Sequence, residues 1–237
     1  MPLAFVDRPL TTPADSFELI FELAYSQLSD RWPVVTGEAG ARYGIDENFE
    51  VGIRLLRVSM SPAPNTGLEN PMGFLRYRLV DGLFELAGYI ESEIPFGGVY
   101  EANLRIETLT RVGRIARLDF GPTVGLLGED PIRFRAWAPL ELAFQIGDHV
   151  KLSAIGIVEL YDLNRARNVL GRAGLRFAYT FGEQRAIADL GLLAMTPNLA
   201  LSGERQQNPA FNNYFLVLVD LRWFLANDDD DDWRALD

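Results

Sequence analysis

The chain has 237 residues, of which 48% are hydrophobic and 23% are charged, a balance that argues against intrinsic disorder. Its formal net charge of −11 argues against nucleic-acid binding, which depends mainly on basic contacts to phosphate. It contains no cysteine, which excludes disulfide bonds, thiolate zinc sites and cysteine nucleophiles. No stretch approaches the roughly 20 apolar residues that a membrane-spanning helix needs.

A regular alternation of side chains begins near the N-terminus. Odd-numbered residues from Phe17 to Tyr25 are large and apolar, whereas the even-numbered ones are Glu18, Ile20, Glu22 and Ala24. Successive side chains of a β-strand point to opposite faces, so this segment is predicted to form a strand with one apolar and one polar face.

The same alternation recurs along the whole chain. It is found at 17–25, 35–43, 49–55, 75–79, 84–91, 104–107, 117–120, 132–145, 151–160, 172–181, 186–194 and 215–223. The sequence therefore predicts about twelve strands, each near the roughly 9–11 residues that cross a bilayer obliquely.

The predicted connections differ between the two ends of the strands. Tight turns rich in Gly, Asp or Asn are predicted at 43–48, 80–82, 111–114, 146–149 and 181–184, where positive φ is needed. The other connections are often longer, at 61–71, 93–99, 162–168 and 196–210, although 30–33 and 128–131 are short. Outer-membrane barrels have short periplasmic turns and longer outer loops, and an even strand number places both termini on the periplasmic side.

A soluble β-sandwich or barrel also alternates, with its apolar face turned inward. Three features favour the inverted arrangement. Nearly every strand alternates, the polar face mixes charge with small residues, and aromatic residues gather near predicted strand ends, as in interfacial girdles. The small residues are Gly40, Gly52, Ala87, Gly121, Gly174 and Gly191, and the aromatic ones are Phe17, Tyr25, Tyr43, Phe49, Phe84, Phe181, Phe211, Tyr214 and Trp223.

The sequence thus predicts an all-β fold, a closed antiparallel up-and-down transmembrane barrel over residues 15–224. An extended segment, 1–14, precedes it, and an acidic tail, 225–237, follows it. Segment 1–14 contains Pro2, Pro9 and Pro13 and could lie in the lumen as a partial plug. The start, Met1-Pro2-Leu3, does not have the form of a signal peptide, so we expect an export signal to have been removed.

The last predicted strand, 213–224, resembles the closing strand of bacterial outer-membrane proteins, which ends in alternating apolar residues and an aromatic one. Trp223 or Phe224 is the candidate aromatic residue, and the tail places it internally. The segment 43–52 resembles a strand–turn–strand of small transporter-like, porin-like barrels, including those grouped with aromatic-degradation operons. The resemblance implies an outer-membrane location, contact with lipid and recognition of the closing strand by the barrel-assembly machinery.

Charged residues of both signs occupy the predicted inner face in nearly equal numbers. The predicted lumen-lining residues are Glu18, Glu22, Glu38, Arg42, Glu50, Arg54, Arg76, Arg78, Glu85, Glu91, Arg105, Glu107, Arg117, Asp119, Arg133, Arg135, Glu141, Glu159, Arg172, Arg176, Asp189, Asp220 and Arg222. Charges inside a narrow barrel must be paired or hydrated. They either close the lumen with ion pairs or form separate acidic and basic walls across a water-filled channel, as in porins.

Sequence motifs for catalysis are not evident. The single histidine, His149, lies in a predicted turn on the periplasmic side, away from the outer rim where a nucleophile–histidine pair would be needed. Neither a Gly-rich phosphate loop nor metal-ligand spacing is present, so we expect no enzyme activity, no cofactor and no metal. The acidic run 228–232 is interpreted as a solvated terminus, with an interaction handle or a loose calcium site as the weaker alternative.

Three functions remain open at this point. The leading hypothesis is a monomeric outer-membrane barrel that forms a narrow passive channel for small solutes or ions, because about twelve strands lie between side-chain-filled eight-stranded barrels and open porins. The second is a closed barrel with a structural, assembly or adhesion role. The third is a soluble β-barrel that binds an apolar ligand.

Overall fold

In a computed structural model, the chain is described at residues 4–28, 34–60, 67–94, 100–128, 132–160, 169–183, 186–196, 199–202 and 214–226. These residues form one 3₁₀ turn, η1 (Phe5–Asp7), and fifteen strand segments. Among them, no helix has the length and apolar character to cross a membrane.

The strand segments follow one another around a single antiparallel sheet. They are β1 (Ser16–Leu28), β2 (Val34–Gly44), β3 (Phe49–Met60), β4 (Gly67–Leu68), β5 (Met72–Val80), β6 (Phe84–Glu93), β7 (Glu101–Val112), β8 (Ala116–Phe120), β9 (Thr123–Leu127), β10 (Arg133–Ile146), β11 (Val150–Leu160), β12 (Val169–Glu183), β13 (Ala186–Met195), β14 (Leu199–Ser202) and β15 (Tyr214–Ala226).

Three of the barrel strands are interrupted, so fifteen segments make twelve strands. β4 and β5 both pair with β3, β8 and β9 both pair with β7 and β10, and β13 and β14 both pair with β12. Pro122 follows β8 and has no N–H to donate, which explains the break between β8 and β9. The predicted number of twelve and the up-and-down order are confirmed.

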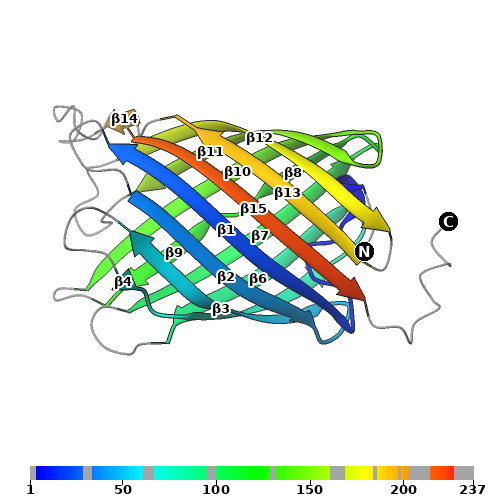
Figure 1. Cartoon of the computed structure of the whole chain (residues 1–237), viewed down its shortest axis with the longest axis horizontal. Coiled ribbons are helices and arrows are strands. Elements are labelled where there is room, and N and C mark those ends of the chain that lie inside the picture. Colours follow the sequence, from blue (N-terminus) through cyan, green and yellow to red (C-terminus); the bar gives the residue numbers. More distant parts are fainter. Residues whose placement is uncertain are drawn as a thin grey trace.

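The sheet closes on itself between the first and the last strand. β1 pairs with β15 in continuous antiparallel register from Ser16↔Ala226 to Leu28↔Tyr214. Closure leaves no free edge, so every strand of the wall has a hydrogen-bonding neighbour on both sides, as a barrel in lipid requires. The strands run obliquely to the long axis of the barrel (Figure 1).

The two ends of the barrel differ. The tight connections include Gly82, Gly113, Gly147 and Gly182, which all have positive φ. We call this the short-turn end, and both the N-terminal segment and the end of β15 lie there (Figure 1). The predicted long connections lie at the other end, the long-loop end. Two of them contain more structure than expected, because β4 lies within 61–71 and β14 within 196–210.

The wall has its apolar face outside, as predicted. Large apolar side chains are exposed on the outside at 48–71%, as at Leu23, Leu75, Leu104, Leu175 and Leu192. Their neighbours along each strand are on the inward face and include Glu22, Arg76, Arg105 and Arg176. The alternative of a soluble barrel, whose apolar face would be turned inward, is therefore wrong.

Aromatic residues form part of a girdle at the short-turn end. Phe17, Tyr43, Phe84, Phe181 and Trp223 each have between 38% and 47% of their surface exposed. Phe17 pairs with Tyr43 across β1 and β2, so these rings lie side by side on the outside. Rings at this level suit the boundary between hydrocarbon and headgroups. Of the other predicted girdle positions, Phe211 lies outside the described residues.

Candidate functional site

The lumen of the barrel contains a cavity of about 360 Å³ whose walls are highly charged. Of the described residues that line it, nine are arginine or lysine and eight are aspartate or glutamate. Several of these carboxylates are completely buried, since Glu18, Glu50 and Asp220 are at most 2% exposed. The interior of this barrel is thus a polar core, the inverse of a soluble protein.

The N-terminal segment, residues 4–15, enters this lumen from the short-turn end. The pyrrolidine rings at Pro9 and Pro13 remove two backbone donors, which prevents the segment from joining the sheet as a regular strand. Val6 is 1% exposed and Arg8 is 4% exposed. The chain turns from this segment into β1 at Asp15, which has a positive φ of 52°.

Side chains of the barrel wall bind the main chain of the N-terminal segment. Arg111 Nε donates to the carbonyl of Val6 at 2.9 Å, and Arg117 Nη1 donates to the carbonyl of Arg8 at 2.7 Å. Arg76 Nη1 donates to the carbonyl of Leu10 at 2.8 Å. The wall therefore satisfies carbonyl groups that would otherwise be buried without partners.

Acidic and amide side chains of the wall accept from the backbone of the same segment. The N–H of Leu10 donates to Glu85 Oε2 at 2.8 Å, and the N–H of Thr12 donates to Glu50 Oε2 at 2.6 Å. The N–H of Phe5 donates to Gln145 Oε1 at 2.9 Å. Because Gln145, Glu85 and Glu50 come from β10, β6 and β3, the segment spans the lumen from one wall to the other.

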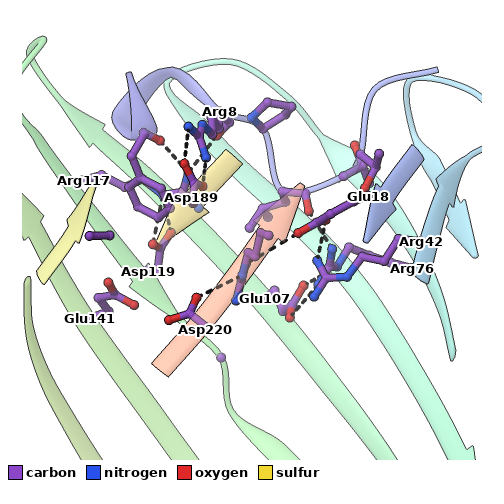
Figure 2. A pocket seen from close by; sticks show the side chains of 18 of the residues that line it. Arg8, Glu18, Arg42, Arg76, Glu107, Arg117, Asp119, Glu141, Asp189 and Asp220 are labelled. Atoms are coloured by element: carbon purple, nitrogen blue, oxygen red, sulfur yellow. Dashed lines mark hydrogen bonds and ion pairs between the residues drawn. The ribbon is translucent and has the colours of Figure 1, made fainter. Parts of the chain in front are cut away.

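Arg8 anchors the segment through its side chain. Its guanidinium forms a bidentate pair with Asp189 of β13, with Nη2 at 3.0 Å from Oδ1, and Nη2 also donates to Thr180 Oγ1 at 3.1 Å. Its Cζ lies 5.3 Å from the centre of the Phe224 ring. Figure 2 shows Arg8 reaching Asp189 at the edge of the pocket.

A second anchor holds the ring of Phe5. Lys151 Nζ lies 3.4 Å from the centre of this ring and Arg117 Cζ lies 4.5 Å from it. Lys151 also donates to Glu141 at 3.1 Å, and Arg117 Nε donates to Asp119 at 2.7 Å. Two cations stacked on one ring, each neutralised by its own carboxylate, fix the start of the segment against β8, β10 and β11.

Arg76 is the centre of the ion-pair network below the segment. Its Nη1 lies 2.9 Å from Glu50 Oε1 and its Nε lies 2.7 Å from Glu107 Oε2. Arg105 approaches the same Glu107 at 3.2 Å. The rings of the network include Tyr89, whose centre lies 5.2 Å from Arg76 Cζ and 4.9 Å from Arg105 Cζ.

Pairing is looser around Glu18, where β1 and β15 close the barrel, whereas the nearby Asp220 pairs closely with Arg176. Arg42 Nη1 is 3.5 Å from Glu18 Oε2, and Arg222 Nη1 is 4.0 Å from Glu18 Oε1. Among the described residues, Glu18 Oε1, Asp220 Oδ1 and the Nε atoms of Arg42 and Arg222 have no hydrogen-bond partner. Buried polar atoms of this kind are completed by water or by a solute.

A third network lies toward the long-loop end. Glu38 accepts ion pairs from Arg54 at 3.1 Å and from Arg57 at 3.4 Å, and Arg57 also reaches Glu93 at 2.8 Å. Glu91 accepts hydrogen bonds from Tyr89 at 2.8 Å and from Asn103 at 2.7 Å. Ion pairs Arg135–Glu101 and Arg172–Glu159 connect further neighbouring strands at this level.

The structure brings most of the predicted lumen residues together in one cavity. The fifteen that line it are Glu18, Glu22, Arg42, Glu50, Arg54, Arg76, Arg105, Glu107, Arg117, Asp119, Glu141, Arg176, Asp189, Asp220 and Arg222. Two others, Arg78 and Glu85, lie toward the short-turn end and pair with each other at 3.8 Å. The remaining six lie toward the long-loop end: Glu38, Glu91, Arg133, Arg135, Glu159 and Arg172.

Several residues of the networks were not among the predicted lumen residues. Arg57 points inward because of a β-bulge between β2 and β3. The pairing register shifts between Ala39 and Gly40 of β2, opposite Leu55 and Leu56 of β3, two consecutive leucines that are both exposed. Arg111 was assigned to a turn, yet it continues the inward set of β7 and donates to the N-terminal segment. Arg8, Lys151, Glu93 and Glu101 were also missed.

Basic and acidic side chains are paired with each other all around the lumen wall. Arg54–Glu38, Arg76–Glu107, Lys151–Glu141 and Arg176–Asp220 each join opposite charges on the same side of the barrel. Separate acidic and basic walls, one of the two arrangements considered from sequence, are not what these pairs build. The lumen is lined by neutralised pairs instead, and long-range fields across it are correspondingly weak.

Glycines on the inner face make room for large side chains of neighbouring strands. A Cβ at Gly52 would strike the ring of Phe74, and it would lie 2.8 Å from the carbonyl oxygen of Ala41. Phe74 is 4% exposed and its ring lies 5.5 Å from Arg42 Cζ. The small residues of the polar face therefore reflect crowding in the lumen, as expected from the sequence.

We expect Gly52→Ala to destabilise the barrel by about 1–3 kcal/mol, because overpacking forces the Phe74 ring and the backbone apart. The measurement is urea unfolding of the refolded barrel in detergent or lipid. Gly73→Ala on the neighbouring strand is the matched control, since a Cβ there meets no atom within 4 Å. Equal unfolding midpoints for the two variants would contradict the crowded lumen.

His149 does not line the cavity. His149 is exposed in the turn between β10 and β11, its Nδ1 lies 2.9 Å from the carbonyl oxygen of Thr180, and its ring stacks on Tyr179. Across the described part of the chain, no group of three or more His, Cys, Asp or Glu residues could hold a metal ion. The tail beyond Ala226, with its alternative calcium site, lies outside the described residues.

No family model matches the chain, and no curated protein matches it. Its structure is similar to that of an outer membrane channel from Pseudomonas putida F1, with a TM-score of 0.62, 11% identity and coverage of 92% of this chain and 98% of that one. It is also similar to the NanC porin, with a TM-score of 0.60, 8% identity and coverage of 86% and 98%. This similarity shows that the chain has the fold of these small barrels, and its apolar outer wall is of the kind that faces lipid.

Proposed function

We propose that the chain is a passive channel of the bacterial outer membrane, narrow enough to admit only ions or small solutes. The observation that carries the proposal is the charged cavity inside the closed barrel. Its volume of about 360 Å³ lies at the lower end of the roughly 300–1,000 Å³ typical of ligand pockets, which favours small solutes over large ones. The structural similarity to a channel and to a porin supports the same function.

The loosely paired group around Glu18 gives the solute path its chemistry. Arg42 and Arg222 approach Glu18 only to 3.5 and 4.0 Å, and Glu18 Oε1 has no hydrogen-bond partner among the described residues. A hydrated ion exchanges part of its shell for such groups without meeting a single dominant charge. We therefore expect weak selectivity between cations and anions.

Planar-bilayer recording of the refolded protein tests the channel directly. We expect resolved conductance steps in the wild type, and Arg54→Gln and Arg222→Gln should shift the reversal potential toward cation permeability, because both guanidinium groups are 27% exposed in the lumen. Arg114→Gln, at an exposed turn position, is the control and should leave the reversal potential unchanged. Absence of steps above background in every protein would refute the channel.

A second candidate function is a closed barrel with a structural or assembly role. The observation in its favour is the N-terminal segment, which spans the lumen and is bound at both walls. Conductance recording separates the two functions, because a barrel that stays closed gives no steps. An adhesion role rests on the outer loops, most of which lie outside the described residues.

We also propose that the barrel acts as a monomer and that β15 is the strand recognised by the barrel-assembly machinery. Trp223 is 45% exposed on the outer face of β15, whereas Phe224 is 7% exposed in the lumen. Of the two candidate aromatic residues, Trp223 is therefore the accessible one. Trp223→Ala should reduce the amount of barrel inserted by reconstituted assembly machinery, and Phe224→Ala should reduce it less.

A further inference from the structure

The N-terminal segment is bound in a way that resembles recognition of a ligand. Six wall side chains, Glu50, Arg76, Glu85, Arg111, Arg117 and Gln145, bond to its main-chain groups between Phe5 and Thr12. Arginines meet carbonyl oxygens, and glutamates or glutamine meet N–H groups. Such contacts recognise the peptide backbone, while one side chain, Arg8, has a dedicated partner in Asp189.

The wall is also shaped for the passage of this segment. A Cβ at Gly44 would strike the carbonyl oxygens of Pro13 and Thr12, so a side chain at this position is incompatible with the observed path of the segment. Tyr43 donates to Asp15 at 2.8 Å, and the N–H of Asp15 donates to the carbonyl of Gly44 at 2.9 Å, which fixes the corner before β1. Thr11 Oγ1 donates to the carbonyl of Glu47 at 2.8 Å.

We propose that the short-turn end of the lumen is a binding site for an extended peptide, and that residues 5–12 occupy it as a tethered ligand. The preferred peptide has an aromatic side chain for the ring site beside Lys151 and Arg117, and an arginine three residues later for Asp189. The consequence for transport rests on the proposed channel. The bound segment narrows the passage, and its release widens it.

Release is favoured by the position of the segment in the chain. On its C-terminal side it joins β1 through Asp15, and it is not itself part of the pairing between β1 and β15, so its release breaks no pairing between these barrel strands. The contacts that hold it are side-chain ones, apart from the backbone contacts of Ala14 and Asp15 with Gly44. The barrel is closed by β1 and β15 whether or not the segment is bound.

Exchanging the charges of the Arg8–Asp189 pair tests the proposal on the full chain. Arg8→Asp and Asp189→Arg each place like charges together, and each should give several-fold larger conductance steps than the wild type. The double variant Arg8→Asp/Asp189→Arg should return to the small steps of the wild type, because the pair is restored with its signs exchanged. Single variants with wild-type steps, or a double variant that stays open, would overturn the tethered-ligand proposal.

A binding experiment keeps this proposal separate from the channel. A fluorescent, N-acetylated peptide of residues 4–11, which ends before the clash with Thr12, is added to the full chain carrying Gly44→Val, in which the added side chain displaces the segment. We expect the peptide to bind, and its Arg8→Asp version to bind roughly 30-fold or more weakly, since loss of a buried charge partner costs that much affinity.

Gly37→Val is the matched control, because a Cβ at Gly37 meets no atom within 4 Å and the segment should stay bound. This control should not bind the peptide. If Gly44→Val misfolds on heat-modifiability gels, a chain lacking residues 4–12 replaces it. Binding without any conductance would support the peptide site and refute the channel, whereas equal binding of both peptides, or of neither, would overturn the peptide site.

Discussion

Replacement of Arg76 by leucine is expected to destabilise the barrel by about 3–5 kcal/mol, because it leaves buried carboxylates without their partner. Glu50 is fully buried and keeps only the 4.0 Å approach of Arg42 and the hydrogen bonds from Thr12. Glu107 loses its 2.7 Å pair, and the carbonyl of Leu10 loses a donor. Equilibrium unfolding in urea, followed by tryptophan fluorescence, measures the loss.

Two further variants show whether the effect is one of buried charge. Arg114→Leu, in an exposed turn, should change stability by no more than about 0.5 kcal/mol. Arg76→Leu combined with Glu50→Gln and Glu107→Gln should recover much of the loss, since the stranded charges are removed. An Arg76→Leu barrel as stable as the wild type would show that the network does not support the fold.

Introduction of a charge on the outer wall is the second change with a large expected effect. Leu175 lies near the middle of β12, is 71% exposed and is flanked by Ala154 and Ala194 on the neighbouring strands. Leu175→Arg should cost about 2–4 kcal/mol, the value for arginine at the midplane of a bilayer. Reversible unfolding from lipid vesicles gives this free energy.

The control for Leu175 is a leucine that is just as exposed but lies at the membrane boundary. Leu83 is 74% exposed in the turn between β5 and β6, so Leu83→Arg should cost only about 0–1 kcal/mol. In a soluble barrel both positions would contact water and neither change would matter. A tolerated Leu175→Arg would therefore contradict the assignment of this wall to lipid.

The period-two pattern was sufficient to predict the barrel, because the two environments of its wall differ so strongly. In β1, residues Phe17 to Tyr25 alternate between exposed apolar and inward positions as the sequence indicates. The alternation between the two faces of the strand continues even where an apolar residue points inward, as Ile20 does, because the neighbouring residues determine which face each position takes. Register and closure follow from the turns that the glycines permit.

Features that interrupt the period were harder to predict. The bulge at Leu55 and Leu56 shifts the parity of β3, so Arg57 faces the lumen, whereas uninterrupted alternation from Arg54 would place it on the outer face. Two consecutive leucines within an alternating segment were the available signal. The inward position of Arg111 could have been predicted by continuing the alternation of Arg105 and Glu107 through residue 109 to residue 111.

The N-terminal segment illustrates the limit of single-sequence reasoning. Its prolines excluded a strand and allowed a plug, but no periodicity connects Arg8 with Asp189, which is 181 residues away. Such a contact depends on which wall the chain reaches after it turns at Asp15. Long-range pairs of this kind are decided by tertiary structure, and the sequence alone contains no local pattern for them.

A cysteine scan along β12 shows whether lipid surrounds this barrel while its charges face a lumen. The chain has no native cysteine, so single cysteines at positions 173–179 can each carry a fluorophore in vesicles that contain spin-labelled lipids. We expect the spin-labelled lipids to quench the fluorophore strongly at 173, 175, 177 and 179, and weakly at 174, 176 and 178. Quenching in the opposite phase, or without alternation, would contradict it.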